Sequence, residues 1–182
     1  MMKDSRVYNK FKQHNAMILN IAIFNIAWFG LVFVGNLFIP IAVILLSIQF
    51  RYFPVMKNEI QLIIFVVTIG SLLDLSLVHF GIFTFPSTQG IPFWLITLWL
   101  CFASTIRHSL AFLANSRVLQ CLVGGVFAPL SYLAGANFSA VQLSPSFAVS
   151  YVILACLWAP LMILIFTVSA WLLPIEEKAN VG

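Results

Sequence analysis

Asp74 stands alone among charged residues in a long apolar stretch of this sequence. No other Asp, Glu, Lys or Arg occurs between residues 60 and 106. A carboxyl group in hydrocarbon costs a few kcal/mol, so Asp74 should face a protein interior and have a partner or be protonated there. Two interpretations remain open: a proton- or ligand-binding site, and a neutral hydrogen-bonded acid that joins helices.

A second group of polar residues lies in residues 102–110, which read FASTIRHSL. If this segment is helical, its periodicity places Cys101, Thr105, His108, Ser109 and Phe112 on one face. Such a stripe can line a cavity, with His108 as an acid or base, or it can hydrogen-bond to a neighbouring helix. Both readings stay open.

Asn25 is a further polar candidate, and we expect it to hydrogen-bond between helices. The sequence lacks a phosphate-binding loop, a dinucleotide glycine pattern, HExxH and GxSxG. Its three histidines, at 14, 79 and 108, fall at three different depths. Its three cysteines lie in apolar runs and form no CxxC pair. We therefore expect no metal and no cofactor, and we assign no catalytic residue.

The composition indicates which elements must hold these side chains. The 182 residues are 62% hydrophobic and only 8% charged, with a mean hydropathy of +1.06. Soluble domains are about a quarter charged, so a soluble fold is excluded. The apolar residues form solid blocks rather than the alternating strands of a membrane β-barrel. The sequence predicts an all-α polytopic membrane protein.

Pro and Gly clusters divide the apolar blocks into six expected transmembrane helices. They cover about residues 16–34, 37–53, 60–80, 92–113, 118–138 and 147–171. Residues 13–50 could instead form one long helix, and the basic residues decide between the two readings. With six spans, one side receives every basic residue outside the spans: Lys3, Arg6, Lys10, Lys12, Arg51, Lys57, Arg117 and Lys178. With one long helix they divide equally between the two sides.

The positive-inside rule therefore favours a six-helix bundle with both termini in the cytoplasm. We expect a basic cytoplasmic segment at 1–15, a membrane domain at 16–171 and a short cytoplasmic tail at 172–182. Within the fifth span, Ser131, Gly135 and Ser139 recur every four residues. This pattern of small residues predicts close helix packing, with Gly135 at the contact.

Depth within the membrane predicts a partner for Asp74. If the third and fifth spans are centred near residues 70 and 128, Asp74 and Tyr132 both lie roughly 6 Å toward the outer face. His108 would lie on the other side of the midplane. We therefore expect the Tyr132 hydroxyl within direct or one-water reach of Asp74.

The segments FASTIRHSL at 102–110 and GVFAPLSYLAG at 125–135, together with Asp74, Asn25 and Trp28, resemble a known family. It is a bacterial family of small inner-membrane proteins, domain of unknown function 2878, and the resemblance covers roughly residues 16–170. Since that family has no assigned reaction, the resemblance implies fold and bacterial inner-membrane location only. Its members are often encoded near fatty-acyl-modifying enzymes, which implies a link to envelope lipid metabolism.

Three functions fit these features. The first is an accessory protein in envelope or fatty-acyl lipid metabolism, with membrane lipids and lipid-modifying enzymes as partners. The second is a small proton- or ion-coupled transporter, which needs a water-accessible cavity at Asp74. The third is a membrane-embedded enzyme on acyl chains, which needs a lipid-sized cleft at His108. The basic residues that give the net charge of +4 lie where they orient a membrane protein, so we expect no nucleic acid partner. The sequence defines no oligomeric state.

Overall fold

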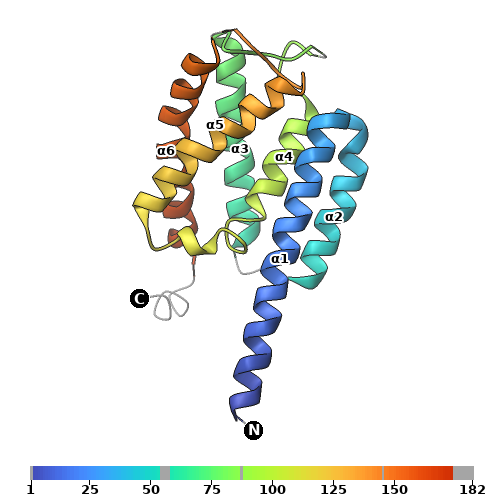
Figure 1. Ribbon diagram of the computed structural model, residues 1–182, viewed down its shortest axis with the longest axis vertical. Helices are drawn as coiled ribbons and strands as arrows, with labels where there is room; N and C mark the ends of the chain where they lie inside the picture. Colours follow the sequence, from blue (N-terminus) through green and yellow to red (C-terminus); the bar gives the residue numbers. More distant parts are fainter. Residues whose placement is uncertain (1, 54–57, 87, 145, 174–182) are drawn as a thin grey trace.

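The computed structural model describes residues 2–53, 58–86, 88–144 and 146–173, which form a bundle of helices (Figure 1). The expected tail lies mostly outside these residues, as do Lys57 and Lys178. The α-helices are α1 Met2–Val34, α2 Ile39–Tyr52, α3 Glu59–His79, α4 Phe93–Ala103, α5 Arg117–Asn137 and α6 Phe147–Trp171. Short 3-10 helices cover Gly35–Phe38 (η1) and Ala111–Leu113 (η2).

Four helical segments of the described chain are long and apolar enough to cross a membrane. They are Ala16–Tyr52, Glu59–His79, Arg117–Asn137 and Phe147–Trp171. The chain is therefore an all-α membrane protein, as the composition predicted. Helix α1 begins at Met2 and continues into the first apolar segment, whose candidate span begins at Ala16.

The first apolar stretch folds back on itself between α1 and α2 (Figure 1). Gly35 begins the turn with a φ of 67°, a conformation that favours glycine because it has no Cβ. Pro40 lies at the start of α2, where its missing N–H costs no helical hydrogen bond. The side chain of Asn36 accepts a hydrogen bond from the Trp94 backbone N–H at 2.9 Å and so attaches the turn to the start of α4.

The expected fourth span, 92–113, is wrong in its second half, because α4 ends at Ala103. The Ser104 and Thr105 hydroxyls donate to the carbonyls of Cys101 and Phe102 at 2.7 and 2.6 Å. Such local bonds compete with the helical ladder. The backbone then continues through turns up to residue 110.

Two buried amide side chains donate hydrogen bonds to the carbonyl that is left exposed at the end of α4. Asn20 on α1 and Gln49 on α2 both donate to the Ser104 carbonyl, at 3.4 and 3.1 Å. Both side chains are fully buried. A helix end inside an apolar bundle needs such partners, since water is absent there. We call the end of the bundle that contains residues 104–110 the turn end.

A short antiparallel ribbon closes the opposite end of the bundle. Strand β1 (Phe83–Thr84) follows α3 and pairs with β2 (Gln142–Leu143), which follows α5, with Phe83 opposite Leu143. We call this the ribbon end. The ribbon connects the loop after α3 to the loop after α5, two segments far apart in the sequence.

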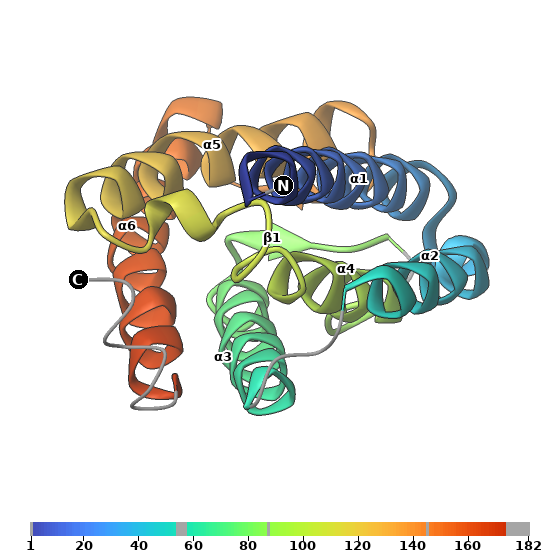
Figure 2. The same cartoon turned by 90° about the horizontal axis from the view of Figure 1, so that it is seen from below.

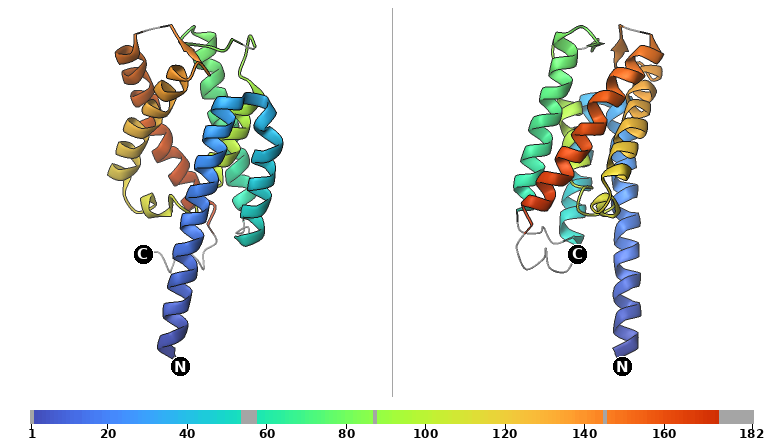
Figure 3. Two further views of the ribbon diagram at one scale, coloured as in Figure 1. Left: turned by 45° about the vertical axis from the view of Figure 1, so that its right-hand side comes forward. Right: turned by 90° about the vertical axis from the view of Figure 1, so that its left-hand side faces the viewer.

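Helix α4 lies in the centre of one group, against α1, α2 and α3 (Figure 2). Helices α5 and α6 form a closely packed pair beside that group (Figure 3). Gly124 permits this pairing, because a Cβ built there would lie 2.6 Å from the Trp158 carbonyl oxygen of α6. The Trp99 ring on α4 stacks on the Trp158 ring, with centroids 5.0 Å apart, and so joins the two groups.

Candidate binding cleft

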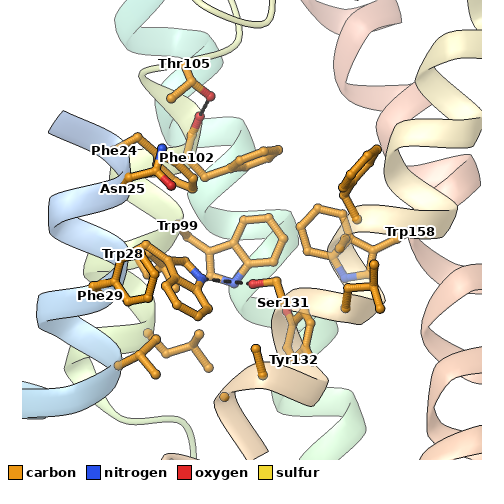
Figure 4. A pocket seen from close by; sticks show the side chains of 18 of the residues that line it. Phe24, Asn25, Trp28, Phe29, Trp99, Phe102, Thr105, Ser131, Tyr132 and Trp158 are labelled. Carbon is orange, nitrogen blue, oxygen red and sulfur yellow. Dashed lines mark hydrogen bonds between the residues drawn. The ribbon is translucent and has the colours of Figure 1, made fainter. Parts of the chain in front are cut away.

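A cleft of about 600 Å³ lies between α1 and α5, with α4 and α6 behind it (Figure 4). Its lining is mostly aromatic and aliphatic and includes Trp28, Trp99, Phe102, Tyr132 and Trp158. None of the lining residues in the described chain is Asp, Glu, Lys, Arg or His. Ligand sites of this volume are common in proteins, and such a lining suits an apolar molecule.

The two helices beside the cleft converge at the ribbon end and diverge toward the turn end (Figure 1). At the ribbon end, the rings of Phe33 and Phe138 lie 4.4 Å apart. Closer to the turn end, Trp28 on α1 donates from its indole N–H to the Ser131 hydroxyl on α5 at 2.9 Å (Figure 4). These contacts close the cleft at one end.

Asp74 lies behind the wall of the cleft and does not line it. Its side chain is fully buried on α3. The Tyr132 hydroxyl donates to Asp74 Oδ1 at 2.7 Å, which confirms the pairing predicted from depth. The Trp99 indole N–H donates to Oδ2 at 2.6 Å. Tyr132 and Trp99 both line the cleft, so they separate the carboxyl group from it.

The bond from Trp99 to Asp74 is an addition to the predicted pair, and the sequence contains a signal for it. The same depth argument, applied to the fourth span, places Trp99 on the outer side of the midplane, near the level of Asp74. An indole N–H is a donor only, so a buried tryptophan needs an acceptor at its own depth. His108, which its predicted depth excluded as a partner of Asp74, lies beside Glu59 instead.

The polar stripe expected on one helical face does not form, because α4 ends before it. Thr105 and Ser109 are buried and line the cleft. His108 points elsewhere, and its Nε2 lies 2.8 Å from Glu59 Oε1 at the start of α3. Phe112 is exposed. The stripe prediction is therefore wrong, and His108 does not reach the cleft.

Asn20 and Asn25, both on α1, make different hydrogen bonds. Asn25 lines the cleft and donates to the Ile21 carbonyl of its own helix at 2.8 Å, so its predicted interhelical bond is absent. Asn20 makes the interhelical contacts instead: its amide donates to the Ser104 carbonyl and accepts from the Ser109 N–H at 3.2 Å.

The close helix contact predicted at Gly135, in the pattern of Ser131, Gly135 and Ser139, is wrong. The Ser131 hydroxyl accepts a hydrogen bond from Trp28 of α1 across the cleft. Gly135 is buried, but a Cβ there would meet only Val141, at 3.7 Å, in the loop after α5. Ser139 follows the end of α5, with a φ of 62°. The close contact between α5 and α6 lies about three turns before Gly135, at Gly124.

A family model described as protein of unknown function (DUF2878) matches residues 17–164. The chain belongs to this family. No curated protein and no solved structure matches it. The DUF2878 match runs from α1 into α6 and so includes every helix that lines the cleft. In this DUF2878 protein, no three His, Cys, Asp or Glu side chains of the described residues gather as metal ligands do.

Proposed function

We propose that this protein binds one hydrocarbon chain of a lipid-like molecule in the cleft between α1 and α5. The observation that carries the proposal is the uncharged, aromatic lining. Phe29 on α1 and Phe127 on α5 line the cleft and are also largely exposed, so they form its rim. In a membrane this rim faces lipid, and a chain can enter sideways without crossing water.

The dimensions of the cleft support this ligand. Its lining runs from Ile21 to Val32 along α1, which is roughly 16 Å at the helical rise. Half of a bilayer's hydrocarbon core is about 15 Å thick. The cleft is about as long as one leaflet is thick. It can therefore hold an extended hydrocarbon chain along its whole length.

The two other hypotheses receive less support from the geometry. Transport coupled to Asp74 needs a water-accessible path to that residue, whereas Trp99 and Tyr132 separate it from the cleft. Catalysis by His108 on an acyl chain needs the cleft to reach that imidazole, which lies beside Glu59 instead. Chain binding uses only the residues that do line the cleft.

We place this activity in the bacterial inner membrane, in a protein with six spans and both termini in the cytoplasm. The directions of the helices support this topology: α1, α3 and α5 run from the turn end to the ribbon end, and α2, α4 and α6 run back (Figure 1). A protein that holds an acyl chain suits an accessory role beside lipid-modifying enzymes.

Tryptophan fluorescence tests the proposal directly. Four of the five tryptophans line the cleft, and the other, Trp171, is 76% exposed. In a Trp171→Phe background, all of the signal therefore comes from the cleft. A long-chain alcohol that is brominated in mid-chain should quench this fluorescence saturably in nanodiscs of unbrominated lipid.

Ala128→Phe should block the cleft, since Ala128 lines it on α5. We expect the apparent affinity to fall about tenfold or more, which corresponds to about 1.4 kcal/mol. Ala22→Phe is the matched control, because Ala22 is exposed on α1 and does not line the cleft. Non-saturable quenching, or equal loss in both variants, would contradict the proposal.

A further inference from the structure

Asp74 places a carboxyl group one side-chain layer behind the cleft. Each of its oxygens accepts one hydrogen bond from a ring that lines the cleft, at 2.6 Å from Trp99 and 2.7 Å from Tyr132. These distances are in the short range typical of hydrogen bonds to a carboxylate. The two rings therefore connect the acid to the cleft.

Within the described ranges of the chain, no cationic side chain is bonded to this acid. The partners of Asp74 in the described chain are Trp99 and Tyr132, both of which are neutral donors. The cleft lining also contains no Lys, Arg or His among the described residues. A buried acid ordinarily pairs with a cation or stays protonated. In this protein, a cation could approach Asp74 from the cleft.

Aromatic rings surround that space. Trp99 and Trp158 stack with an interplanar angle of 7°, and the Tyr132 ring lies 6.1 Å from Trp158 (Figure 4). The faces of such rings attract ammonium groups, an interaction that strengthens when water is excluded. Donation of the indole N–H and phenol O–H to a carboxylate increases the negative charge of both rings. An anionic group would meet no positive side chain here.

We propose that the cleft selects a lipophilic cation, an amine or quaternary ammonium group on a hydrocarbon chain. The ammonium group lies against the rings of Trp99, Tyr132 and Trp158, with Asp74 as its counter-charge behind them. The hydrocarbon chain occupies the rest of the cleft. This inference rests on the proposed binding of a hydrocarbon chain and specifies the group that the chain carries.

Three probes with the same brominated alkyl chain test the selectivity. They end in trimethylammonium, in a hydroxyl group and in a sulfonate, and their binding is measured by tryptophan quenching of the Trp171→Phe protein in nanodiscs of uncharged lipid. We expect trimethylammonium to bind about tenfold more tightly than the alcohol, and the sulfonate to bind most weakly. The net charge of the chain is +4, which would attract the sulfonate and repel trimethylammonium. Non-specific electrostatic attraction therefore cannot produce the expected order.

Asp74→Asn should reduce the ratio of the trimethylammonium affinity to the alcohol affinity about tenfold, to near one, while saturable binding of the alcohol persists. The alcohol thus reports that the variant is folded. If the variant does not fold, the ranking of the three probes on the Trp171→Phe protein tests the selectivity by itself. Equal or tighter binding of the alcohol or the sulfonate would overturn the selectivity, whereas failure of all three probes would overturn chain binding itself.

Discussion

At the scale of single residues, the acid on α3 is held by donors from two other helices. Trp99 comes from α4 and Tyr132 from α5. A buried network of this kind is worth more than its separate bonds suggest, because losing one member leaves another unsatisfied. The Asp74 carboxyl group therefore helps to hold α3, α4 and α5 together.

A double-mutant cycle tests this role. We expect Asp74→Asn and Tyr132→Phe each to destabilise the protein, and their effects to couple by about 1 kcal/mol or more, because the two groups share one hydrogen bond. Unfolding in mixed micelles with increasing SDS provides the measurement. Thr167→Val is the control partner for Asp74→Asn, since Thr167 is exposed and bonds only to its own helix at Ile163. Additive losses for Asp74 and Tyr132 would refute the coupling.

At the scale of the elements, the α5–α6 pair depends on one glycine. The Cβ of any other residue at Gly124 would lie 2.6 Å from a backbone oxygen of α6, which cannot move without moving the helix. The next residue, Gly125, has ordinary room, because its Cβ would lie 3.6 Å from that of Ala159. The two adjacent glycines thus form a natural comparison.

Gly124→Ala should destabilise the protein by about 1–3 kcal/mol, the usual cost of overpacking. Gly125→Ala should be neutral or slightly stabilising, because alanine has the better helix propensity. Thermal unfolding in detergent, followed by the monodisperse peak in gel filtration, compares the two. Similar melting temperatures for both variants would show that the close contact at Gly124 does not limit helix packing.

At the scale of the whole molecule, the distribution of basic residues and the helix directions agree. Arg51 at the end of α2, Arg107 in the turn after α4 and Arg117 at the start of α5 all belong to the turn end. The loops 81–91 and 139–146 at the ribbon end contain neither Lys nor Arg. This asymmetry favours a cytoplasmic turn end.

Reporter fusions test this orientation. A fusion after Gly182 should give a cytoplasmic signal and a fusion within residues 86–90 a periplasmic one, because the basic residues retain the turn end inside. Reducing the charge bias, with Lys introduced at Thr84 and Gln142, should weaken the periplasmic signal. A periplasmic signal from the C-terminal fusion of the unaltered chain would exclude six spans with this orientation.

The sequence alone determined the membrane class, the helical character and most helix boundaries, because these follow from long apolar blocks and from Pro and Gly between them. The end of α1 and both ends of α6 lie where they were predicted. Depth along a helix also predicted the Asp74–Tyr132 contact, since two spans crossing one bilayer share a scale of depth.

Only the tertiary structure decided where α4 ends and which side chains line the cleft. Ser104 and Thr105 could continue a helix, and they end it here because Asn20 and Gln49 accommodate the exposed Ser104 carbonyl from other helices. That early end turns His108 toward Glu59 and away from Thr105 and Ser109. Which glycine of α5 lies against the α6 backbone likewise depends on how α5 rotates against α6. Helical periodicity defines the faces of a helix, but only packing against the neighbouring helices selects the face that meets each of them.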